Sequence, residues 1–294
     1  MPWLQLAMNL GRIEPETLQD VLESIGAVAI SFSNAGSDPV LEPTPGSTPL
    51  WARTRVSALL PTSLRSDAVA DEIQTRLTGA DFNSLEFSVI PDYDWQQEWK
   101  RHAHPMRFGK RLRVCPSTRK KQETGWAEVV LEPGLAFGTG AHESTAMCLE
   151  WLAGTPLEGK TVLDFGCGSG VLAISALALG ARSAVAVDRD DQALQATRAN
   201  ASRNACDHQL RVLALSDLPT NAQYDVLLAN ILSATLIDLA PTLSKITAPG
   251  ANVILSGILD HQSEGVRLAY ANWLELSVKN EQNGWVLLTG ARAH

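Results

Sequence analysis

Apolar residues in the first 90 positions recur at strand spacing and at helix spacing in turn. Alternation of apolar and polar positions predicts strands, and apolar residues three or four apart predict helices. The expected strands are residues 3–10, 27–32, 51–60 and 85–90, with expected helices at 15–25 and 66–77 and a Gly-, Pro- and Ser-rich loop at 33–49. This βαββαβ order is that of the ferredoxin-like arrangement, so residues 1–90 are expected to form a small α+β domain.

Residues 91–125 are expected to link two domains. Residues 94–103 have helical spacing, with Trp95 and Trp99 four apart on one face, and residues 116–125 are rich in turn-forming residues. Tryptophans at this spacing usually pack against protein, and lining a substrate site is the alternative.

From about residue 126 the pattern changes to strands that alternate with helices. The expected strands are 162–164, 184–188, 210–215, 224–229 and 252–256, the expected helices are 171–179, 192–204, 234–246 and 262–270, and the chain ends in strands 273–278 and 285–289. Alternating strands and helices indicate a doubly wound α/β domain over 126–294, here with a terminal antiparallel hairpin. Its ligand is expected beyond the carboxyl ends of the strands, where the strand order reverses.

Composition restricts the function classes. The chain has 294 residues, 45% of them apolar, but neither a membrane-length apolar run nor a signal-like N-terminus, so we expect a cytoplasmic protein without membrane contact. Its four cysteines are scattered, so we expect no metal site. A net charge of -8 disfavours nucleic acid and favours a basic partner, although residues 91–125 are themselves basic.

The run DFGCGSG (164–170) carries the clearest chemical signal. It joins an expected strand to an expected helix, and its glycines at 166, 168 and 170 allow a sharp turn close to a ligand. A dinucleotide fingerprint requires its third glycine at 171, where this chain has Val171. Asp164 also suits a cationic ligand better than a pyrophosphate. The motif therefore favours S-adenosylmethionine over a nicotinamide dinucleotide.

A second carboxylate strengthens this interpretation. Asp188 ends the next expected strand, where an acidic residue can accept hydrogen bonds from the two ribose hydroxyls. The glycines alone would be compatible with a mere turn, but the combined pattern predicts a nucleoside site.

Two further segments are expected near this site. EPGLAFGTGAHEST (132–145) is a glycine-rich segment that opens a helix, and without a following GK[ST] it is not a Walker loop. His142 within it is expected to cap or pack rather than act as a base. Asn230 directly follows the fourth expected strand, where an asparagine is usually a turn residue.

These motifs together resemble the bacterial ribosomal protein L-eleven methyltransferases. The resemblance rests on EPGLAFGTGAHEST (132–145), LDFGCGSGVLAI (163–174), AVDRD (186–190), LANIL (228–232) and LSGIL (255–259), and it spans nearly the whole chain. Glu132 and Ser144 replace an Asp and a Thr that the family often has, both conservative changes.

The resemblance implies S-adenosyl-L-methionine as cofactor and methyl transfer to lysine ε-amines and the N-terminal α-amine of the ribosomal protein, free or ribosome-bound, by a monomer. The N-terminal domain would recognise that protein. The implied cofactor residues are Asp164, Gly166, Gly168, Asp188, Thr145 and Asn230, with Phe137, Gly138, Thr139 and Gly140 of the loop at the methionine end. Asn230 would also be catalytic, by orienting the amine.

Three alternatives stay open. A ribosomal-RNA or other nucleic-acid N-methyltransferase is the main one, disfavoured by acidity and by Ile231 and Leu232 where many base methyltransferases have Pro-Pro-Tyr. A nicotinamide oxidoreductase and a non-catalytic binding module are the others.

Overall fold

A computed structural model describes residues 2–36, 50–77, 81–90, 104–117, 124–132 and 140–293. The chain divides into two compact units, Met1–Trp95 and Gln96–His294, and each is considered by itself. The expected helix at 94–103, most of the expected loop at 33–49, and Phe137, Gly138 and Thr139 lie outside the described residues.

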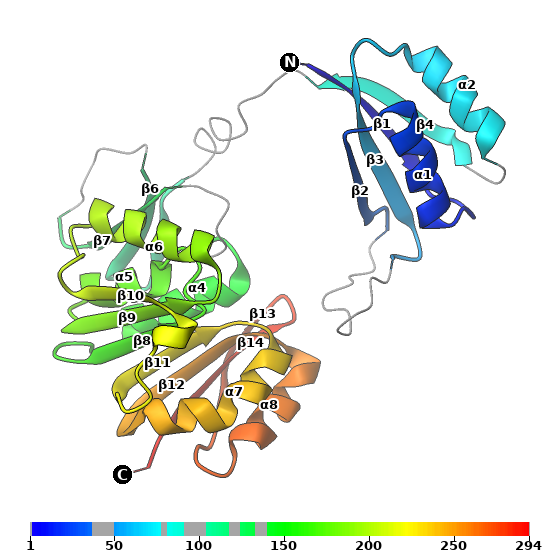
Figure 1. The fold of residues 1–294 in the computed structure, drawn as a ribbon. Coiled ribbons are helices and arrows are strands. Elements are labelled where there is room, and N and C mark those ends of the chain that lie inside the picture. Colours follow the sequence, from blue (N-terminus) through cyan, green and yellow to red (C-terminus); the bar gives the residue numbers. More distant parts are fainter. Residues whose placement is uncertain are drawn as a thin grey trace. The chain divides into compact units, whose positions relative to one another are not determined.

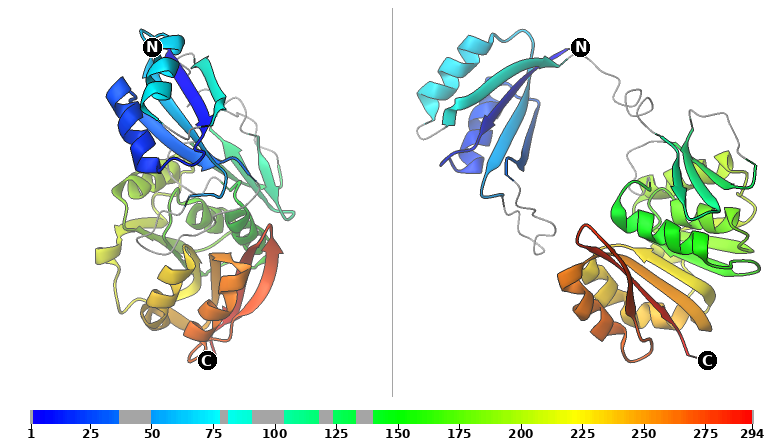
Figure 2. Two further views of the ribbon diagram at one scale, coloured as in Figure 1. Left: turned by 90° about the vertical axis from the view of Figure 1, so that its right-hand side faces the viewer. Right: turned by 180° about the vertical axis from the view of Figure 1, so that it is seen from behind.

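The N-terminal unit is a four-stranded antiparallel sheet with two helices on one face (Figures 1 and 2). Its elements are β1 (Trp3–Asn9), α1 (Pro15–Ile25), β2 (Ala29–Asn34), β3 (Thr54–Pro61), α2 (Ser66–Arg76) and β4 (Asp81–Ile90). The strands lie in the order β2-β3-β1-β4, and every pair is antiparallel. This is the expected βαββαβ sequence of elements.

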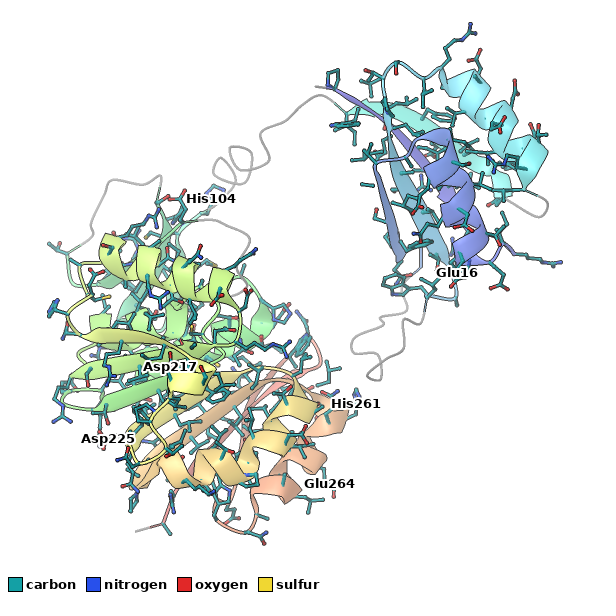
Figure 3. All side chains as sticks on the ribbon, in the orientation of Figure 1. Glu16, His104, Asp217, Asp225, His261 and Glu264 are labelled. Atoms are coloured by element: carbon teal, nitrogen blue, oxygen red, sulfur yellow. The ribbon has the colours of Figure 1, made fainter. Side chains whose placement is uncertain are left out.

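Alternation of side chains along the strands builds the core of this unit. Every second residue of β1 and β3 is buried, and α1 covers them with Leu18, Val21 and Leu22. Pro15 opens α1, where its missing N–H costs nothing, and Gly26 ends it at φ 105°. Charged residues lie on the exposed faces of the helices, such as Glu16 of α1 here and Glu264 of the helix Ser263–Tyr270 in the C-terminal unit (Figure 3).

The C-terminal unit is built on a seven-stranded sheet. Its elements are β5 (Met106–Phe108), β6 (Leu112–Pro116), β7 (Ala127–Leu131), α4 (Glu143–Gly154), β8 (Thr161–Phe165), α5 (Val171–Ala178), β9 (Ser183–Asp188), α6 (Asp191–Arg203), β10 (Leu210–Ala214), β11 (Tyr224–Asn230), α7 (Ser233–Ile246), β12 (Thr247–Leu259), α8 (Ser263–Tyr270), β13 (Ser277–Gln282) and β14 (Trp285–Ala291), with short 3₁₀ turns at Leu215–Asp217 and Asp260–Gln262. The large sheet has the order β10-β9-β8-β11-β12-β14-β13.

Strands β8 to β12 are parallel. The inner strands β8, β9 and β11 are buried on both faces, so they read as apolar runs, whereas the edge strand β10 is largely half-buried or exposed. One core packs α4 and α5 against the sheet face that includes Val162 and Val226, and the other packs α7 and α8 against the face that includes Leu163 and Leu227 (Figure 1). The strand order reverses between β8 and β11, as expected for a doubly wound sheet.

A second sheet, β5-β6-β7, lies against α5 and α6. Its strand β5 is antiparallel to β6, and β6 is parallel to β7. No strand was expected between 91 and 125, but β5 and β6 form there. The sequence signal was weak because β6 carries the buried arginine Arg113, paired with Glu128 on β7 at 3.5 Å.

The terminal hairpin forms, but one strand was misplaced. The expected strand 273–278 was wrong over most of its length, because β13 begins only at Ser277. Leu274 and Leu276 are buried in an irregular segment, so their alternation reflected burial rather than strand pairing. The exposed edge strand β13 has mainly polar side chains, and Asn283 and Gly284, both at positive φ, make the turn to β14.

Among the described residues, none of the helices is long and apolar enough to cross a membrane. No group of three or more His, Cys, Asp or Glu side chains in these same segments is placed to hold a metal ion.

Candidate active site at the carboxyl ends of the strands

A tight glycine turn, residues 166–170, joins β8 to α5. Gly166, Gly168 and Gly170 have φ values of 75°, 53° and 78°, a region that side-chain-bearing residues rarely adopt. The backbone N–H groups of Gly166 and Cys167 both donate to the carbonyl of Val187, at 2.8 and 3.0 Å. The turn is therefore fixed to the end of β9.

Two of these glycines are required by contacts within the protein. A Cβ on Gly166 would lie 2.3 Å from Cγ2 of Ile231, and one on Gly170 would lie 2.7 Å from Cγ2 of Thr197. The resemblance implies that Gly166 permits close approach of a cofactor. The structure adds a different reason, because Ile231, directly after Asn230, occupies the space that a side chain at 166 would need.

Asp188 is oriented by the turn. It ends β9 and is half-buried, with Oδ2 accepting from the N–H of Gly168 at 3.0 Å and Oδ1 accepting from the N–H of Asp190 at 3.1 Å. Each carboxylate oxygen has a second acceptor direction left for a ligand. The carboxylate is thus held in one orientation at the mouth of the turn, with capacity for two hydroxyl donors.

Asp164 is buried beneath the turn. Its side chain is 1% exposed, and Oδ2 accepts from the N–H of Ala173 in the first turn of α5 at 3.0 Å. Burial raises the pKa of Asp164 to about 7, opposed by the Ala173 hydrogen bond and reinforced by the charge of Asp188. Asp164 therefore ties β8 to α5 and is partly protonated at neutral pH, and a nearby cation would favour its charged form.

Asn230 and Thr145 are joined by a hydrogen bond at the end of β11, the strand that pairs with β8. Asn230 ends β11, and its Nδ2 donates to the hydroxyl of Thr145 at 3.0 Å. The first turn of α4 is held a second time, because buried Ser256 on β12 donates from Oγ to the carbonyl of Ser144 at 3.1 Å. With Nδ2 engaged, Oδ1 is the Asn230 atom that can accept from an amine.

The C-terminal part of the 132–145 segment packs around α4. Gly140 is buried at φ 89°, and a Cβ there would lie 3.1 Å from Cε of Met106. His142 caps α4, its Nδ1 accepting from the N–H of Ser144 at 3.2 Å, and its ring meets Trp285 edge-on at 4.9 Å. The expectation that His142 caps the helix is confirmed.

The described site residues therefore converge. Asp164, the glycine turn, Asp188 and Asn230 all lie at the carboxyl ends of β8, β9 and β11, and the first turn of α4 joins them through Thr145. The group offers fixed carboxylate and amide acceptors beside a buried carboxyl, and this donor set suits a polar, cationic ligand.

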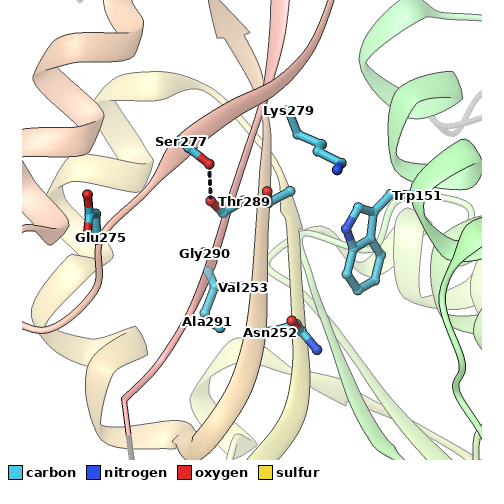
Figure 4. Close-up of a pocket in the computed structure, with 9 residues that line it drawn as sticks. All are labelled: Trp151, Asn252, Val253, Glu275, Ser277, Lys279, Thr289, Gly290 and Ala291. Atoms are coloured by element: carbon cyan, nitrogen blue, oxygen red, sulfur yellow. Dashed lines mark hydrogen bonds between the residues drawn. The ribbon is translucent and has the colours of Figure 1, made fainter.

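A hollow of about 430 Å³ lies elsewhere, between α4 and strands β12 to β14 (Figure 4). It is lined by Trp151, Asn252 and Lys279, among others. Asn252 pairs with Val226, whereas Asn230 pairs with Ser256, four residues farther along β12. That spacing is about 13 Å along the strand, so the hollow lies toward the opposite end of the sheet from the glycine turn.

Three supporting residues were missed in the sequence. Thr197 and Asn200 of α6 and Ser256 of β12 bind the glycine turn or the start of α4 by side-chain hydrogen bonds, at 2.9 to 3.1 Å. All three are buried polar side chains. A buried polar side chain needs a partner, so polar residues on an otherwise apolar strand or inner helix face are the signal that could have identified them.

The order of the strands, the glycine turn and the strand-end residues Asp188 and Asn230 define the class of protein to which the C-terminal unit belongs. A crystal structure of a ribosomal protein L11 methylase from Lactobacillus delbrueckii subsp. bulgaricus has a TM-score of 0.59 and 31% identity, covering 65% of this chain and 100% of its own. The C-terminal unit has a methyltransferase fold.

Sequence comparison gives the family. The family model "Ribosomal protein L11 methyltransferase (PrmA)" matches residues 2–293. The ribosomal protein L11 methyltransferase of Hahella chejuensis is 44% identical over 293 residues, and that of Pseudomonas aeruginosa is 45% identical over 293 residues; each alignment covers 99% of both chains. The chain belongs to the ribosomal protein L11 methyltransferase family.

Proposed function

We propose that this protein, as a monomer, transfers methyl groups from S-adenosyl-L-methionine to lysine ε-amines and the N-terminal α-amine of ribosomal protein L11. Such a substrate would place the reaction in the cytoplasm. The observation that carries the proposal is Asp188, held by the backbone N–H groups of Gly168 in the glycine turn and of Asp190. Only β8 separates its strand from β11, which carries the Asn230–Thr145 pair. Family membership supports the choice of substrate.

The site residues fit the cofactor. Asp188 would accept hydrogen bonds from both ribose hydroxyls, and the Thr145 hydroxyl would face the methionine end together with Gly140 and the residues at 137–139. Asp164 and Asp188 favour a ligand with ammonium and sulfonium charges. When bound, the cofactor supplies an electrophilic methyl group for direct transfer to nitrogen.

The chain's own contribution is then positioning. The Oδ1 atom of Asn230 would accept a hydrogen bond from the neutral amine and direct its lone pair toward the methyl group. The Nδ2 bond to Thr145 restricts rotation of the amide, so this orientation is set before substrate binds. A lysine amine has an unperturbed pKa of about 10.4 and must lose its proton first, to water or on desolvation in the site.

We also propose that residues 1–90 form a ferredoxin-like domain that recognises the ribosomal protein. The antiparallel order β2-β3-β1-β4 with both helices on one face supports that fold. The linker was expected to run from 91 to 125 and the catalytic domain from 126. The pairing of β5 with β6 and of β6 with β7 supports a shorter linker, with β5 and β6 counted in the catalytic domain.

Mass spectrometry of purified basic ribosomal proteins, incubated with the enzyme and methyl-labelled cofactor, tests the proposal. Label is expected on L11 lysines and its α-amine, and it should survive nuclease treatment. Label on ribosomal RNA with none on protein would contradict the proposal and support the nucleic-acid alternative.

Cofactor affinity is expected to depend on pH through Asp164. A bound cation favours the charged carboxylate, so below its pKa of about 7 binding must displace a proton. Cofactor affinity at pH 6 should be about tenfold weaker than at pH 8, because about nine-tenths of the Asp164 carboxyl groups are protonated at pH 6. Calorimetry with S-adenosylmethionine across this range measures the effect.

The Asp164→Asn variant is the control for this pH dependence. It keeps an acceptor for Ala173 but cannot titrate, so its affinity should be lower at pH 8 and less dependent on pH. Because its pKa is raised in the folded protein, the protonated Asp164 carboxyl contributes stability that is fully present below about pH 4 and is lost as the pH rises through about 7. At pH 8 the ligand-free Asp164→Asn variant should therefore melt a few degrees higher than wild type. An identical pH dependence in both proteins would exclude Asp164 as the titrating group.

A further inference from the structure

One face of α6 contacts both glycine-rich segments of the site. Thr197 and Asn200 lie in α6 and Asn204 is its C-cap residue; they are three and four residues apart, so they lie along one side of the helix. Thr197 donates from Oγ1 to the carbonyl of Gly168 at 3.0 Å, within the glycine turn. This face of α6 is therefore placed to fix the position of the glycine turn relative to the 132–145 segment.

Asn204 binds the edge of β7. Its Oδ1 accepts from the N–H of Val130 and its Nδ2 donates to the carbonyl of the same residue, both at 2.8 Å. Strand β7 is the edge strand of the order β5-β6-β7, so the side-chain amide pairs with it as a neighbouring strand would. Asn204 fixes the strand but has no hydrogen bond to the glycine turn.

Asn200 makes the connection. Its Oδ1 accepts from the N–H of Glu132 at 3.1 Å, and its Nδ2 donates to the carbonyl of Ser169 at 2.9 Å. Glu132 is the first residue of the 132–145 segment, and Ser169 lies in the glycine turn. Asn200 is 2% exposed, so little water competes for either bond, and losing one leaves a buried polar group unpaired.

We propose that Asn200 is a positioning residue for the cofactor, whose single buried amide fixes the distance between the glycine turn and the base of the 132–145 segment. This inference rests on the proposed function, because it assumes that the cofactor binds at the glycine turn. Asn200 acts through Ser169 and Glu132, and it should affect cofactor affinity more than the rate of methyl transfer at saturating cofactor.

The Asn200→Asp variant tests this with little change of volume. A carboxylate still accepts from Glu132 but turns an oxygen toward the Ser169 carbonyl, where a donor is required. We expect Kd and KM for S-adenosylmethionine to rise about tenfold at pH 8, with kcat within about twofold of wild type. Burial raises the pKa of the new carboxyl, and its protonated form can donate to Ser169. The ratio of variant to wild-type Kd should therefore shrink as the pH falls to 5.5.

Asn204→Asp is the matched control. It places the same acid one helical turn away and disrupts β7 without touching the glycine turn, so its Kd should stay within about twofold of wild type even if its Tm falls equally. Asn200→Ser, whose short side chain cannot span both partners, replaces Asn200→Asp if that variant does not fold.

Two outcomes separate the hypotheses. Equal Kd values for the Asn200 and Asn204 variants, or no recovery at low pH, would overturn the positioning role while leaving the proposed function intact. Failure of the wild-type protein to bind S-adenosylmethionine would instead overturn the proposed function.

Discussion

Replacing Asn230 with alanine is expected to lower kcat for methyl transfer about 100-fold while cofactor affinity changes by less than about fivefold. The amide is held by the Thr145 hydroxyl at 3.0 Å, so its Oδ1 is already oriented when the amine arrives. Losing a positioned acceptor at the reacting nitrogen costs about 3 kcal/mol of transition-state stabilisation. Single-turnover kinetics with labelled cofactor and calorimetry on the same preparation measure the two quantities separately.

The variant also leaves the Thr145 hydroxyl without this partner, which should cost about 1 kcal/mol of stability. Thr145→Ser is the control, because it keeps the hydroxyl that orients Asn230 and should retain most of the rate. A kcat for Asn230→Ala within twofold of wild type would rule out Asn230 as the residue that orients the amine.

The Asp188→Ala variant is expected to weaken binding of S-adenosylmethionine by at least about 100-fold. Two hydrogen bonds from the ribose to a charged acceptor would be lost, each worth about 1.5–3 kcal/mol. The N–H groups of Gly168 and Asp190 would lose their acceptor as well, which loosens the turn. At saturating cofactor the rate should fall much less than the affinity, because the amine is oriented at β11. Calorimetry gives the affinity.

Asp190→Ala separates the ribose contact from a general loss of negative charge. Asp190 is exposed, two residues farther along, and its Oδ1 caps α6 by accepting from the N–H of Gln192 at 2.9 Å. This variant should bind the cofactor within about threefold of wild type and lose about 1 kcal/mol of helix stability. Equal losses of affinity in the two variants would contradict a specific role for Asp188.

Sequence patterns predicted the large-scale plan where local signals agree with the fold. Parallel strands buried on both faces, such as Val162 to Phe165, read as apolar runs, and positive-φ positions in the turn at 166–170 require glycine. The prediction was wrong at 273–278, where buried residues alternate with exposed ones but do not pair as a strand. It also missed β5, β6 and β7, where Arg113 of β6 is buried in an ion pair with Glu128 of β7.

The residues of the site were recognisable from the sequence because each lies in a short motif whose residue types indicate its chemical role. Asp164, Asp188 and Asn230 each end or nearly end a strand, so the sequence alone determined that they gather at one edge of the sheet. Phe137, Gly138 and Thr139 stay predictions, outside the described residues.

Only the tertiary structure decided how these residues are held. The pKa of Asp164 follows from its complete burial, the need for glycine at 166 follows from Ile231, and the role of Asn200 follows from Glu132 and Ser169, which are 68 and 31 residues away in the chain. Burial and long-range hydrogen bonds depend on packing between distant segments, and a residue's type and spacing do not encode which partner it meets.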